Sequence, residues 1–195
     1  SSDLGRKMKR SICLICTCFI LISVMIGCNF RQDSNLKEER VRDEVVINGD
    51  YPAYSTLDEA IGAANLIIEG KSLGKEYKML DIGSRGSSSM PYTVYDIEVV
   101  KVYKGDIKEG DVIEVKILGG KFKGVEYVLA SPAPILKENK EYVLFLSTYE
   151  NSPASLINPI DSVFELKDEG FRALNSNSLI KSFLPDELTG KLNES

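Results

Sequence analysis

The clearest pattern along the chain is an alternation of side-chain character between residues 92 and 103. Tyr95, Ile97 and Val99 fall on one face of an extended segment, whereas Asp96 and Glu98 fall on the other. A period of two, over twelve residues rich in β-branched and aromatic types, predicts a long and bent strand.

The same alternation recurs in residues 112–118, where Ile113, Val115 and Ile117 are expected to point inward and Glu114 and Lys116 outward. Residues 142–146 are apolar at every position, which is typical of a central strand covered on both faces. Further strands are predicted at residues 66–70, 125–129, 163–166 and 170–173, the last two as a hairpin.

Helical signals lie at the two ends of this strand-rich region. Thr56 with Glu59 three residues later has the pattern of a capping box and predicts a short helix before the first of these strands. Residues 177–192 are expected to be helical in two pieces, broken at Pro185. Because no long helix separates the strands, a parallel sheet is not favoured. The predicted fold is mainly β: a small antiparallel barrel with a short helix before it and helical pieces after it.

The N-terminal region has a different pattern. Residues 1–7 precede Met8 and are interpreted as an expression remnant ahead of the natural start. Lys9 and Arg10 then precede seventeen uncharged residues, 11–27, which end at Cys28. This order of charge and hydrophobicity is typical of an export signal. A retained transmembrane anchor would need about twenty apolar residues, and an ordinary cleaved signal would favour a small residue where Met25 stands.

Residues 24–28, with the sequence Val-Met-Ile-Gly-Cys, resemble the lipobox of bacterial lipoproteins. The resemblance implies that residues 8–27 are a signal peptide, cleaved between Gly27 and Cys28, and that Cys28 carries the lipid. Several acyl chains on one residue bind a bilayer stably, so we expect a plasma-membrane protein on the extracytoplasmic face. Residues 28–44 are mostly charged and polar and are expected to form a flexible tether before a single domain at 45–195.

Charge and composition exclude several kinds of partner and chemistry. Residues 1–27 contain four basic and one acidic side chain, so the remaining chain has 20 basic and 28 acidic residues and a net charge of −8. This acidic balance does not favour nucleic-acid binding. The chain has no histidine and no cysteine after Cys28, which excludes Ser-His and Cys-His nucleophiles and a histidine-ligated zinc site. We expect no cofactor and a monomeric domain.

Two motifs keep an alternative open. Asp96 and Glu98 share one face of a strand and could act as paired carboxylates, although a solvated strand face is the simpler interpretation. Glu114 and Lys116 could pair across to that face. Residues 83–89 are rich in glycine and serine and could hold an anion through backbone N–H groups, although a solvated loop is simpler.

Several segments also resemble a widespread group of small exported domains of Gram-positive bacteria, which are distantly similar to the OB-barrel of netrin-like and tissue-inhibitor-of-metalloproteinase domains. The segments are residues 66–70, 99–105, 110–111, 119–120 and 134–146. The resemblance covers residues 56–173 and implies an OB-like barrel. It implies no inhibitory mechanism, because those inhibitors use a free N-terminal cysteine braced by disulfides, whereas Cys28 is expected to carry lipid.

Three functional hypotheses follow. The first is a non-catalytic binding or interaction module with an envelope protein or glycan as partner. The second is a carboxylate-dependent hydrolase of envelope glycans that uses Asp96 and Glu98. The third, which rests on fold analogy alone, is a domain that acts like a protease inhibitor.

Overall fold

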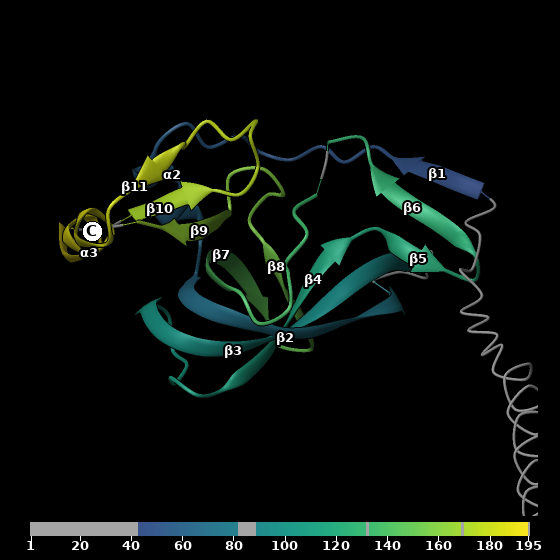
Figure 1. The fold of residues 1–195 in the computed structure, drawn as a ribbon, viewed down its shortest axis with the longest axis horizontal. Coiled ribbons are helices and arrows are strands. Elements are labelled where there is room, and N and C mark those ends of the chain that lie inside the picture. Colours follow the sequence, from purple (N-terminus) through teal and green to yellow (C-terminus); the bar gives the residue numbers. More distant parts are fainter. Residues whose placement is uncertain (1–42, 82–88, 132, 169, 195) are drawn as a thin grey trace, which may run out of the picture. The chain divides into compact units, whose positions relative to one another are not determined.

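Five strands close into a ring in the computed structural model of the chain (Figure 1). Around the ring they are β7 (Glu141–Tyr149), β2 (Leu66–Leu80), β3 (Met90–Lys104), β4 (Val112–Leu118) and β8 (Ser152–Leu156), and β8 pairs again with β7. The structure describes residues 43–81, 89–131, 133–168 and 170–194, which belong to one unit spanning residues 40–195. The mainly β, barrel-like fold expected from the sequence is confirmed.

Strand pairing in the ring is antiparallel except between β4 and β8, which run parallel. The sequence pattern did not predict this junction. It arises because β7 and two further strands intervene between β4 and β8 along the chain, so β8 returns to the open edge of β4 in the same direction. Closure at this point leaves neither strand of the pair with a free edge.

The long strand predicted from alternation is β3, and it bends against an equally long β2. Register shifts interrupt their pairing in three places, and such bulges bend a strand and increase its twist. One shift adjoins Gly70, where an added Cβ would lie 2.4 Å from Cγ2 of Ile97. A larger residue at position 70 would therefore displace the buried side chain of Ile97.

A second, three-stranded sheet leaves the barrel at the end of β4. It consists of β5 (Gly120–Phe122), β6 (Val125–Leu129) and β1 (Asp43–Ile47), with β1 parallel to β6. Gly119 and Gly120 make the turn with φ of 99° and 126°, values that side-chain-bearing residues rarely adopt. A Cβ on Gly119 would also lie 2.7 Å from the carbonyl oxygen of Tyr127. The glycine pair therefore both ends β4 and redirects the chain.

The apolar residues form two cores, one on each side of the barrel wall. Inside the barrel lie alternate residues of β3, β4 and β7, among them Tyr95, Ile97 and Val115. Outside it, the opposite face of β7 packs with β9 (Val163–Lys167), β10 (Gly170–Ala173), β11 (Ser182–Phe183), α2 (Leu57–Ala63) and α3 (Pro185–Glu194). Residues 142–146 contribute to both cores and are fully buried, which confirms the predicted central strand.

Two segments at the ends of this outer core test sequence predictions: the capping box before α2 and the C-terminal tail. Thr56 and Glu59 form the expected capping box, and each side chain accepts from the other residue's backbone N–H. In the C-terminal tail, only the piece after Pro185 is helical. The predicted helical piece before it is wrong, because Phe183 is drawn into β11 and packs with Phe164 at 4.7 Å between ring centroids. Its burial outweighs local helical preference.

The connection between β8 and β9 is held by a buried carboxylate. Asp161 is 2% exposed and accepts from the backbone N–H groups of Tyr54 and Leu179, from the Ser178 hydroxyl and from the Asn158 amide. One carboxylate therefore joins the loop before α2 and the loop before β11 to this connection. The outer core depends on it.

Candidate functional site

A pocket of about 460 Å³ opens beside β4 and β8. Its polar lining side chains come from segments far apart in the sequence: Tyr51, Asp81, Tyr92, Lys116, Tyr149, Ser152 and Ser155. A volume of this size lies within the range that holds small molecules, about 300–1,000 Å³. OB barrels bind ligands on the face of their second and third strands, between the loops that follow the first and fourth strands. In this barrel those strands are β3 and β4, and Asp81 and Tyr149 stand at the two loops.

Lys116 is the side chain that sets the electrostatics of the pocket. It alternates outward on β4 as the sequence predicts, yet it is only 7% exposed. Its Nζ donates a hydrogen bond of 2.5 Å to Oγ of Ser152 and lies 4.5 Å from the ring centroid of Tyr149 and 5.9 Å from that of Tyr92. Burial lowers the pKa of this lysine, because it disfavours the charged form.

The pairing of the strands explains why these groups meet. Ser155 lies opposite Lys116 in the parallel β4–β8 ladder, and Ser152 lies opposite Tyr149 in the β7–β8 ladder. The hydroxyls of Tyr149 and Ser155 are 2.8 Å apart. The short strand β8 therefore brings two hydroxyls to a lysine that belongs to another part of the chain.

Two further tyrosines complete the wall. Tyr92 is 8% exposed, and burial raises the pKa of its hydroxyl, with smaller contributions from Tyr51 and Tyr149. Burial likewise raises the pKa of Tyr51. Asp81 is exposed and accepts a 2.7 Å hydrogen bond from the hydroxyl of Ser89. At neutral pH the pocket therefore presents neutral phenols and serines around one lysine, with a carboxylate on an exposed residue.

No protein-family model matches this chain, and no curated protein matches it either. The function of this protein is therefore inferred from its own residues.

Three other lysines of the described segments pair with carboxylates. Lys78 pairs with Glu76 and Glu114, Lys167 with Glu165, and Lys191 with Asp58. Within residues 43–81, 89–131, 133–168 and 170–194, Lys116 forms no ion pair with a carboxylate. A mostly buried ammonium without a carboxylate partner among these residues is costly, because its contact with water is limited and its hydrogen-bond acceptor, the Ser152 hydroxyl, is neutral.

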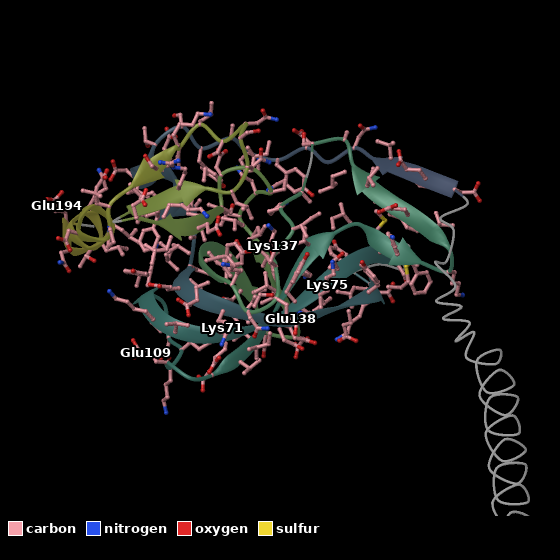
Figure 2. All side chains as sticks on the ribbon, in the orientation of Figure 1. Lys71, Lys75, Glu109, Lys137, Glu138 and Glu194 are labelled. Carbon is pink, nitrogen blue, oxygen red and sulfur yellow. The ribbon has the colours of Figure 1, made fainter. Side chains whose placement is uncertain are left out.

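A second pocket of about 380 Å³ lies between the barrel and the β5–β6 hairpin. Its wall includes Tyr77, Tyr95 and Tyr127 together with an exposed Ile135. Lys75, labelled in Figure 2, has its Nζ 5.8 Å from the Tyr77 ring centroid and 6.0 Å from that of Tyr95. Lys75 is exposed to solvent, so this pocket has no buried charge that would select a ligand.

The acidic residues singled out from the sequence, Asp96, Glu98 and Glu114, line neither of these two pockets. Asp96 is exposed and lies opposite Glu114 rather than opposite a lysine, whereas Lys116 lies opposite Val94. The predicted pairing of Lys116 with the acidic face of β3 is therefore wrong, and Glu114 instead accepts from Lys78 at 2.7 Å.

Several predicted features fall on other parts of the chain. Gly27 and Cys28, and residues 83–88 of the loop considered for anion binding, lie outside the described residues. In the segments that the structure does describe, no group of three or more histidine, cysteine or acidic side chains is placed to hold a metal ion. No helix among those same segments is long and apolar enough to cross a membrane.

Proposed function

We propose that this protein is a cell-envelope lipoprotein, held by Cys28 on the extracytoplasmic face of the plasma membrane, whose barrel domain binds a small ligand without transforming it. The anchor is supported by the sequence of residues 9–28. The binding role is supported by the pocket beside Lys116, at the position where OB barrels take their ligands.

The observation that supports the proposal most strongly is that Lys116 is buried in the pocket wall without a carboxylate partner among the described residues. A lysine that merely solubilises a strand extends into water, as Lys78 and Lys75 do in part. Lys116 is instead enclosed by Tyr92, Tyr149 and Ser152 and has no carboxylate partner among the described residues. Such a site is stabilised when an external anion supplies the missing charge.

Carboxylate-dependent hydrolysis has less support. Catalytic carboxylate pairs stand on either side of a substrate cleft. Asp96 and Glu98 line neither pocket, and Asp96 faces solvent. Their position agrees with the solvated face of a strand.

A second candidate function rests on one contact. Ser152 Oγ and Lys116 Nζ are 2.5 Å apart, and burial lowers the pKa of the lysine. Serine–lysine pairs of this kind serve as nucleophile and base in acyl transfer without any histidine. A fluorophosphonate probe distinguishes the two functions. Binding alone predicts no covalent adduct, whereas an adduct on Ser152 that disappears in Lys116→Met would make the protein an acyl-transfer enzyme.

The binding function is tested by thermal denaturation of the full chain against fractionated small molecules from bacterial envelopes. At least one fraction should raise the melting temperature of the wild type and leave Lys116→Met unchanged. Lys78→Met, which removes a half-buried, ion-paired lysine of β2 outside the pocket, is the matched control and should respond like the wild type. A ligand site at Lys116 would be refuted if every active fraction stabilised Lys116→Met as much as the wild type. It would also be refuted if no fraction stabilised the wild type.

A further inference from the structure

The chemistry of the pocket narrows the ligand. Lys116 has three N–H donors, of which one goes to Ser152. The rings of Tyr149 and Tyr92 lie near the ammonium, but an aromatic face offers no lone pair as strong as an anionic oxygen. The group that completes this site is therefore an acceptor with negative charge.

The other residues that line the pocket limit how much negative charge a ligand can carry. Among the described residues that line the pocket, Lys116 is the one cation and Asp81 is an acid. A phosphate carries between one and a half and two negative charges at neutral pH, and proteins usually hold it with several basic or backbone N–H donors. A lining with one ammonium and one carboxylate matches a single negative charge better.

The remaining lining fits a hydroxylated body rather than a hydrocarbon. Ser152, Ser155 and the phenols of Tyr51 and Tyr149 both donate and accept hydrogen bonds. Tyr149 is 51% exposed, so its ring also offers an open apolar surface to the C–H face of a saturated ring. Hydroxyls and an aromatic face together are suited to a sugar.

We infer that the pocket beside Lys116 binds an acidic sugar, with a single carboxylate on the lysine ammonium and ring hydroxyls on the serine and tyrosine hydroxyls. This inference rests on the proposed binding function and adds the ligand class. It also agrees with the expected location of the domain, because envelope glycans lie within reach of a tethered extracytoplasmic module.

The test uses ligands that share a ring and differ in charge. Ligand-observed NMR on the full chain in detergent would measure the affinities of N-acetylmuramic acid, N-acetylglucosamine and N-acetylglucosamine 6-phosphate, and of glucuronate and glucose. At least one of the two acids should bind about tenfold or more tightly than its neutral counterpart, as expected for a charge-assisted hydrogen bond. Lys116→Met should abolish this difference, and Lys78→Met should leave it unchanged.

Each other outcome overturns the ligand class. Equal binding of acid and neutral sugar would show that the ammonium does not select charge. Tighter binding of the phosphorylated sugar would replace the carboxylate by a phosphate. If none of these compounds bound while an envelope fraction still stabilised the wild type but not Lys116→Met, the acidic-sugar inference would fail and the binding function would stand. A failure of both assays would remove both.

Discussion

Replacing Lys116 by methionine should leave the fold at least as stable as it is in the wild type. The substitution removes one hydrogen bond to Ser152 and two contacts with aromatic rings. A hydrogen bond from a charged group contributes roughly 1.5–3 kcal/mol, and each ring contact about 0.5–1 kcal/mol. Ser152 is only partly buried, so its hydroxyl can bond to water once the lysine is gone.

The opposing term is the desolvation of the ammonium, which amounts to several kcal/mol for a buried charge. Lys116 is 7% exposed and has no carboxylate partner among the described residues, so this cost is not offset by an ion pair. Methionine has nearly the same length and packs well against the rings of Tyr92 and Tyr149. The two sides are of similar size, and replacing a buried charge by an apolar side chain of similar volume is often neutral or stabilising, so we expect a net change between zero and about 2 kcal/mol in favour of the variant.

Urea denaturation of the unit 40–195, followed by circular dichroism, measures the free energy of unfolding for both proteins. The pH dependence gives a second reading. Because the folded protein has the lower lysine pKa, the unfolded state binds the proton more readily. Wild-type stability should therefore rise as pH increases from the folded pKa towards 10.5, and this rise should be missing in the variant. A loss of more than about 1.5 kcal/mol in Lys116→Met would show that the ammonium stabilises the fold, and would contradict the functional interpretation.

Three further predictions concern other parts of the chain. Asp161→Ala should lower the free energy of unfolding by about 3 kcal/mol in urea denaturation, because it leaves buried donors from three segments without their acceptor. A hydrogen bond from the Ser55 backbone N–H lowers the pKa of Glu59 in the folded protein. The ionised Glu59 carboxylate should therefore stabilise the fold above about pH 4.5, and this stabilisation should disappear as pH falls through the folded pKa. Unfolding curves of Glu59→Gln, measured across the same pH range, should lack this dependence. Cys28→Ser should abolish incorporation of an alkyne fatty acid and leave residues 8–27 attached, as measured by intact mass.

Local periodicity was enough to predict four of the five strands that build the barrel, although β2 continues ten residues beyond the predicted 66–70 and β8 was not predicted. The alternation around Tyr95 and Ile97 defines β3, and the wholly apolar residues 142–146 define the strand shared by both cores. The capping box at Thr56 likewise depends only on residues three apart. These features are local because a single strand or helix turn already contains the signal.

Pairing between distant segments was not predictable in the same way. The parallel junction of β4 with β8 depends on how intervening strands return, and β11 exists because Phe183 packs against Phe164 and Phe171. The carboxylate of Asp161 gave no signal in the sequence, because three of its four partners lie 17, 18 and 107 residues away and only Asn158 is close. Tertiary contacts decide these features, and neither propensity nor alternation contains them.

At the candidate site, β4 shows both a feature that local alternation predicts and one that only tertiary contacts decide. Alternation placed Val115 and Ile117 inside the barrel and Lys116 outside it, and the structure confirms this. Alternation also makes an outward lysine look like an ordinary solvated residue. The burial of Lys116 comes from Tyr149 and Ser152, which β7 and β8 deliver from more than thirty residues away. Because the barrel core lies on the opposite face of β4, the pocket can change its ligand chemistry without disturbing the packing that holds the strand. The fold therefore supplies a stable wall, and in the proposed binding site Lys116 and the side chains that reach it from β7 and β8 would select the ligand.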